Sequence, residues 1–85
     1  MSMVQQIIAA VTAAERQIDD QIGKLNSYVR EIDKVTNKAN AAFEGTTQSY
    51  GPQMIQQLAA TKAQVNQSIE TLQAAKDKLL RVRMV

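Results

Sequence analysis

Apolar residues recur every seven positions through two long segments of this chain, and that spacing restricts the folds open to it. The first segment carries Val4, Val11, Ile18, Leu25, Ile32 and Ala39, and the second carries Leu58, Val65, Leu72 and Leu79. An apolar repeat of seven is typical of helices that pack along a shared seam. The strict alternation that marks a half-buried β-strand is missing from both segments.

Residues that interrupt helices gather between the two segments. Gly45, Gly51 and Pro52 lie there, and the remaining glycine, Gly23, destabilises a helix interior by only about 1 kcal/mol relative to Ala. Pro52 suits the first position of a helix, where the N–H that proline lacks has no partner anyway. We therefore expect a single all-α domain over residues 1–85, folded as an antiparallel two-helix hairpin. Its expected elements are a helix over about 2–42, a turn over about 43–52 and a helix over about 53–83.

The composition argues against catalysis. The 85 residues include no Cys, no His and no Trp. The chain therefore lacks disulfides, the usual zinc ligands and the usual general base near neutral pH. Asp19 and Asp20 are adjacent, so on a helix their carboxylates point about 100° apart and cannot converge on a substrate. We expect no catalytic, cofactor-binding or metal-binding residues, and we predict that the chain is not an enzyme.

Charge and hydropathy exclude further classes of function. The net charge of +2 comes from basic residues spread among acidic ones, whereas nucleic-acid binders concentrate positive charge on one face, often beside stacking aromatics. We expect neither a nucleic acid nor a small molecule as ligand. The longest apolar run, Ile7–Val11, is too short to span a bilayer, and no basic segment precedes it. We expect no transmembrane segment and no cleavable signal peptide.

Two helices alone form a thin rod that shelters little of its apolar surface. The apolar arc of the first helix is wider than one facing helix can cover, so a second hairpin completing a four-helix bundle is the favoured arrangement. A second copy and a different helical protein satisfy this requirement equally well. The residues predicted to form the hairpin seam or the interface are Val11, Ile18, Leu25, Ile32, Leu58, Val65, Leu72 and Leu79. The sequence does not assign which of these residues face the sister helix and which face the partner.

The turn carries the tripeptide Phe43, Glu44 and Gly45, which resembles the Trp-x-Gly motif of the WXG (ESAT-like) family. These are small helical-hairpin proteins exported by type VII secretion systems of Gram-positive bacteria. The resemblance extends to the chain length and to a helix of about forty residues before the turn. It implies turn roles for Phe43, whose ring would close the end of the hairpin, and for Gly45, which would permit the backbone turn.

The resemblance implies a protein that is cytoplasmic before export and is then secreted without a cleavable signal peptide. Many family members or their partners carry Tyr-x-x-x-Asp/Glu as an export signal. Here Tyr28 and Tyr50 are followed four positions on by Ile32 and Met54. The missing signal implies that a partner supplies it, as in the small helical proteins that pair with the N-terminal domain of LXG-type toxins.

A filament subunit is the alternative. Needle proteins of type III secretion systems are also short helical hairpins with a proline-containing turn, although the Pro-Ser-Asx-Pro turn expected of them is missing here. Polymerisation discriminates between the two, because a needle subunit forms filaments whereas a bundle partner stops at a small oligomer.

Overall fold

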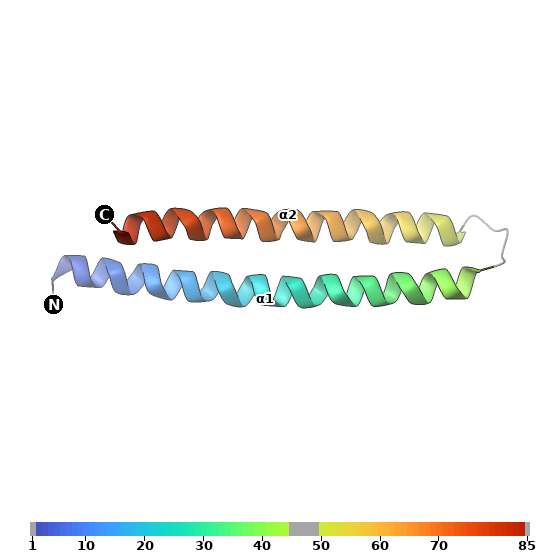
Figure 1. Cartoon of the computed structure of the whole chain (residues 1–85), viewed down its shortest axis with the longest axis horizontal. Helices are drawn as coiled ribbons and strands as arrows, with labels where there is room; N and C mark the ends of the chain where they lie inside the picture. The colour runs from blue at the N-terminus through green and yellow to red at the C-terminus, as the bar shows by residue number, and fades with distance from the viewer. Residues whose placement is uncertain (1, 45–49, 85) are drawn as a thin grey trace.

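Two long helices lie side by side and antiparallel in the computed structural model, which describes residues 2–44 and 50–84 (Figure 1). Helix α1 spans Met3–Phe43 and helix α2 spans Tyr50–Met84. The rod that they form measures 67 × 15 × 13 Å. The described residues contain no strand, so the predicted all-α hairpin is confirmed.

Ser2 caps the first helix. It has an extended backbone, and its hydroxyl oxygen accepts a hydrogen bond from the Gln5 N–H at 3.2 Å. A second bond joins the Gln6 N–H to the Ser2 carbonyl oxygen at 3.2 Å. The first bond satisfies an N–H group that has no carbonyl acceptor inside the helix, and the second is the first i to i−4 bond of α1.

Helix α2 begins earlier than the sequence predicted, at Tyr50 rather than near residue 53. Gly51 and Pro52 therefore belong to its first turn. Proline is tolerated there because the N–H groups of the first turn have no intrahelical acceptor to lose. Gly45, the predicted glycine of the turn motif, lies outside the described residues.

Gly51 lets the two helices approach closely at the turn end. It is buried, and a Cβ atom placed on it would lie 2.8 Å from both Cβ and Cγ of Phe43, the last residue of α1. Any side chain at this position would meet the part of Phe43 nearest its backbone. The aromatic residue predicted to close the hairpin thus packs against a glycine that the sequence analysis had treated only as a helix breaker.

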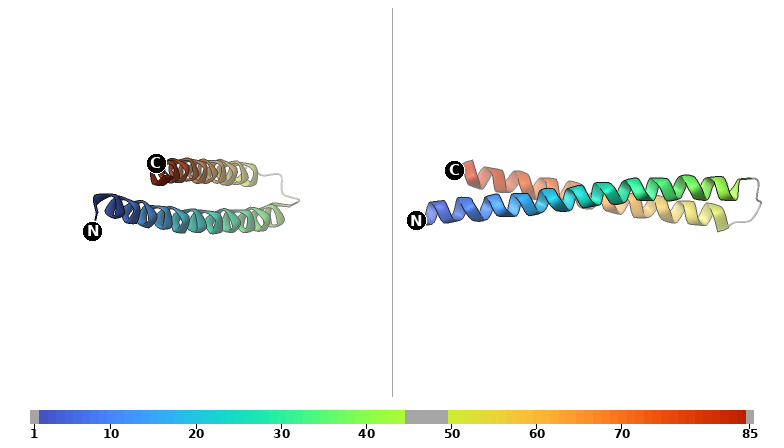
Figure 2. Two further views of the ribbon diagram at one scale, coloured as in Figure 1. Left: turned by 60° about the vertical axis from the view of Figure 1, so that its left-hand side comes forward. Right: turned by 90° about the horizontal axis from the view of Figure 1, so that it is seen from below.

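The apolar repeat of seven forms the seam between the helices. When heptad positions are lettered so that Val11 and Leu58 occupy d, the a positions include Ile22, Val29, Ile55 and Ile69. The helices cross at a shallow angle (Figure 2), as expected when a repeat of seven keeps a seam in contact along its length. Phe43 continues the a positions at the turn.

Few residues of this seam are fully sheltered. Among the described residues, the buried apolar side chains are Val11, Ile32, Ala39 and Ile69. The other apolar seam residues retain partial exposure because only one helix covers them. The core is a single line of contacts rather than an enclosed interior.

The two glycines within the helices provide a matched pair of substitutions. Gly51→Ala is expected to destabilise the protein by about 1–3 kcal/mol, because the added methyl group overlaps Phe43. Gly23→Ala is expected to stabilise it by about 1 kcal/mol, since a Cβ there meets nothing within 4 Å and alanine favours the helix. Urea unfolding followed by circular dichroism at equal protein concentration measures both. Equal stabilisation by the two substitutions would contradict the close packing of Gly51 on Phe43.

Candidate protein-binding surface

All eight predicted seam residues occupy d positions, four on each helix. Val11 and Ile32 are buried, whereas Ile18, Leu25, Leu58, Val65, Leu72 and Leu79 are half-buried. The d positions follow the line along which α1 and α2 meet, so these side chains pack primarily against the sister helix. Any partner would therefore be bound mainly by other residues.

Charged residues interrupt the seam at several a positions. Lys62 Nζ lies 2.7 Å from Asp33 Oδ1, and Lys76 Nζ lies 2.7 Å from Asp19 Oδ1. Both pairs link α2 to α1. The hydrogen bond to Asp19 raises the pKa of Lys76. Because all four side chains remain substantially exposed, these pairs align the helices more than they stabilise them.

Glu15 is the exception, since it is a buried charged residue. Only 8% of its surface is exposed, and its Oε1 atom has no hydrogen-bond partner. Arg83 Nη1 lies 3.6 Å away, within range of an ion pair but too far for a hydrogen bond. A carboxylate held in this way lacks the contacts that normally offset its loss of hydration.

The two broad faces of the hairpin differ in chemistry. In an antiparallel pair of helices, the g positions of both helices flank one side of the seam and the e positions flank the other. The ion pairs confirm this arrangement, because both reach out to e positions, Asp19 and Asp33. The e side also carries Asn26, Asn40, Asn66 and Gln73.

We call the g side the apolar face. It consists of Ile7, Ala14, Gln21, Tyr28, Val35 and Ala42 of α1 together with Met54, Thr61, Ser68, Ala75 and Val82 of α2. None of the ten basic and eight acidic residues of the chain occupies one of these positions. This uncharged strip runs along both helices.

The large apolar side chains that remain exposed gather on this face. Among the described residues, they are Met3, Val4, Ile7, Ile8, Tyr28, Val35, Met54 and Val82. The last four and Ile7 belong to the apolar face, and the other three lie at the start of α1. Tyr28 is 51% exposed and Val82 is 54% exposed. Monomeric proteins rarely leave contiguous apolar strips of this kind in water.

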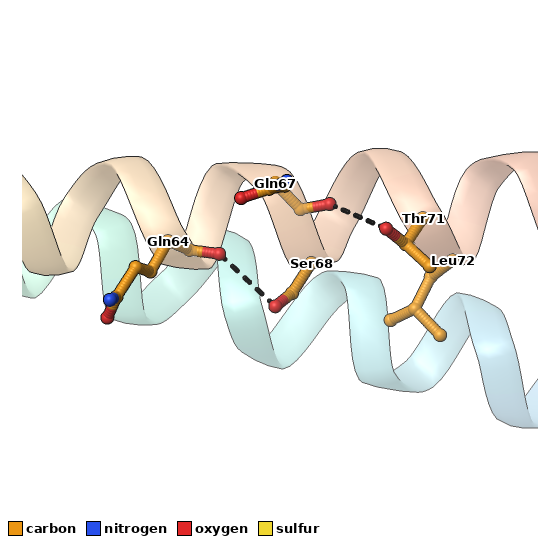
Figure 3. A pocket seen from close by; sticks show the side chains of 5 residues that line it. All are labelled: Gln64, Gln67, Ser68, Thr71 and Leu72. Atoms are coloured by element: carbon orange, nitrogen blue, oxygen red, sulfur yellow. Dashed lines mark hydrogen bonds between the residues drawn. The ribbon is translucent and has the colours of Figure 1, made fainter.

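A shallow hollow of about 520 Å³ lies beside the middle of this strip on α2, lined by Gln64, Gln67, Ser68, Thr71 and Leu72 (Figure 3). The hydroxyl groups of Ser68 and Thr71 donate hydrogen bonds to the carbonyl oxygens of Gln64 and Gln67, at 3.2 and 3.0 Å. No base stands among these residues to activate a hydroxyl group.

A second hollow, of about 450 Å³, opens where the chain ends meet. It is lined by Val4, Ile7, Ile8, Val82 and Arg83, which places Ile7 and Val82 of the apolar face on the same side of the hairpin. Helix α1 projects beyond the end of α2 here (Figure 1). Met3 and Val4, at 75% and 64% exposure, are therefore covered only slightly by α2.

The described residues show no centre for metal chemistry and no membrane segment. Across residues 2–44 and 50–84, no group of His, Cys, Asp or Glu is arranged to hold a metal ion. Over the same ranges, neither helix is apolar enough over a sufficient length to cross a bilayer.

Comparisons of the chain with protein-family models, curated proteins and solved structures found no match. The resemblance to the WXG family therefore rests on the turn residues and the hairpin architecture, and it stays a prediction.

The apolar face was not predicted from the sequence, because the repeat of apolar residues does not by itself separate the g positions from the a and d positions of the seam. From the sequence, the apolar arc of the first helix had been treated as a single surface, and Val35, Met54 and Val82 were not singled out. A signal that separates them was present in the sequence, namely the absence of charge at every g position. It becomes readable only after the structure has shown which heptad positions face the sister helix.

Glu15 provides a test of the energetics of the seam. Glu15→Leu is expected to stabilise the hairpin by about 1–3 kcal/mol, because it replaces a poorly paired buried carboxylate with an apolar side chain. Arg83, at 38% side-chain exposure, remains open to water. The free energy of unfolding from urea titration is the measurement.

Glu70→Leu is the matched control, since Glu70 is exposed on α2. Its effect is expected to stay within about 0.5 kcal/mol. Destabilisation of the hairpin by Glu15→Leu would show that the long ion pair with Arg83 stabilises the hairpin by more than the loss of hydration of the Glu15 carboxylate destabilises it.

Proposed function

We propose that this chain is a non-catalytic binding module that completes a four-helix bundle with a second helical protein through its apolar face. The observation that carries the proposal is the confinement of Ile7, Tyr28, Val35, Met54 and Val82 to one uncharged side of the hairpin. In four-helix bundles a third apolar position beside a and d points into the shared core. Here the g positions have that character and the e positions do not.

The exposed area of the chain supports the same conclusion. It exposes 6606 Å², whereas a compact monomer of 9.4 kDa exposes roughly 5,000 Å². The excess of roughly 1,600 Å² exceeds the 800 Å² or so that each partner buries in an interface of standard size. Covering the apolar face would remove much of this excess from water.

We further propose that the complex belongs to a type VII secretion pathway, as a substrate or as the export partner of a larger protein such as an LXG-type toxin. The support is the WXG-like tripeptide that begins with Phe43, together with the hairpin architecture. Phe43 ends α1 and packs against Gly51, which fits an aromatic residue that closes the hairpin. In this role a protein exported with the bundle supplies the export signal, and the chain supplies helix surface.

Paired lysine substitutions on opposite sides of α1 test the binding surface. Tyr28→Lys with Val35→Lys places two charges on the apolar face, whereas Asn26→Lys with Asn40→Lys places the same two charges on the e side. All four parent residues are exposed, and lysine favours a helix, so both variants are expected to remain folded. The apolar-face variant is expected to lose association by at least tenfold, because two buried ammonium groups would lose their hydration.

Association is measured in two ways: by light scattering of the purified chain, and by recovery of helical partners on the tagged chain in its native cell. The e-side variant is expected to match the parent in both assays. Parent-like behaviour of the apolar-face variant in both assays would refute the proposal. Growth of the parent into open-ended filaments would favour the needle-subunit alternative instead.

A further inference from the structure

We infer that the occupant of the apolar face is a second copy of this chain, laid face to face with both turns at the same end of the bundle. The inference rests on the proposed function, because it names the partner for the surface defined above. In this arrangement a two-fold axis runs along the rod between the two hairpins. It places α1 of one copy over α2 of the other.

The register of the hairpin determines which residues meet. When two residues pair across the seam, their sequence numbers add up to about 95, as for Asp33 with Lys62 and Asp19 with Lys76. On the apolar face, this register sets Tyr28 beside Ser68 within one chain. The two-fold axis along the rod then places Tyr28 of one copy over Ser68 of the other, at the 520 Å³ hollow of α2.

Side-chain sizes favour this arrangement. Tyr28 is large and Ser68 is small, whereas Ala14 and Ala42 are small and their neighbours Val82 and Met54 are large. Laying α1 over α2 of the other copy therefore sets a larger side chain over a smaller one in each of these layers. Cores pack densely when large and small residues alternate across facing positions.

The reversed arrangement, with the turns at opposite ends, packs poorly. With Tyr28 at its centre, α1 would lie over α1 of the other copy and α2 over α2. Tyr28 would then meet Tyr28, and Ser68 would meet Ser68. The first contact is overfilled and the second leaves a void, and both defects weaken packing.

Charge does not oppose the preferred arrangement. The charged residues that border the apolar face on α1 are Lys24, Glu31 and Lys38, and they would face Thr71, Gln64 and Gln57 of the other copy. No two like charges are brought together there. The reversed arrangement would place Lys24 near Glu31, but an exposed ion pair contributes little compared with core packing.

The open end of the hairpin is also accommodated. With both turns at one end, the two hollows lined by Ile7, Ile8 and Val82 lie at the same end of the bundle and face each other. The apolar residues of their walls then cover one another, and Arg83, which also lines each hollow, keeps its ion pair with Glu15 of its own chain. The excess exposed area of each chain is sufficient for an interface of standard size.

Distance measurement between two identical labels tests the orientation. The chain has no cysteine, so Gln53→Cys provides a single attachment point on the outward side of α2 near the turn. With both turns at the same end, the spin labels of a dimer are expected at the same height and roughly 30 Å apart, since the two α2 helices lie diagonally across a bundle whose neighbouring helix axes are roughly 8–10 Å apart. In the reversed arrangement centred on Tyr28 they would lie more than roughly 40 Å apart, since Gln53 is level with an α1 residue about 14 positions from Tyr28 and each position adds about 1.5 Å.

Cross-linking gives an independent measurement. Val35→Cys and Thr61→Cys chains are mixed and treated with a short bismaleimide, since these residues face each other between copies in the preferred arrangement. A covalent dimer is expected in the mixture and in neither chain alone. The matched control mixes Val35→Cys with Gln21→Cys, which meet only in the reversed arrangement, and is expected to give none.

Each outcome decides between the alternatives. A dimer by light scattering with the short label distance and the Val35–Thr61 cross-link supports the inference. A dimer with the long distance, or with the control cross-link, overturns it. A monomeric chain that still recovers a different helical protein through its apolar face overturns the second copy as partner and leaves the proposed function standing. A monomeric chain without any partner on that face overturns both.

Discussion

The packing of apolar d residues between α1 and α2 is the interaction on which the rest of the protein depends. It brings two helices that would be marginal alone into a rod, and it determines which side of each helix remains in water. Leu25, Leu58 and the other d residues keep the two helices in contact along the seam. The g positions of both helices are thereby turned to one side and form a single surface.

The same seam is weakened where charged residues enter it. Lys62 and Lys76 reach outward to acidic partners on α1, and Glu15 remains buried with only a long ion pair to Arg83. Polar groups at seam positions often select one register among several at some loss of stability. Such a role fits a hairpin whose external surface works only when α1 and α2 are correctly aligned.

A thin seam and an uncharged face beside it are the features expected of a protein that association would stabilise further. The described surface provides hollows for side chains but no cluster of reactive groups. Export together with a partner, as the WXG-like turn implies, would suit such a chain because the complex would bury what the single hairpin leaves exposed. The Phe43–Gly51 contact closes the hairpin at the opposite end from the exposed start of α1.

The sequence by itself determined the two helices, because a repeat of seven and a single region of glycine and proline allow few other structures. It also indicated Phe43 at the end of α1. Only the tertiary structure decided that helix α2 begins at Tyr50, that Gly51 admits Phe43, and that Leu25 faces the sister helix while Tyr28 does not. Those facts depend on the rotation and register of one helix against the other, and such contacts join residues far apart in the chain. Local periodicity describes a stripe, but only packing shows which half of the stripe is already covered.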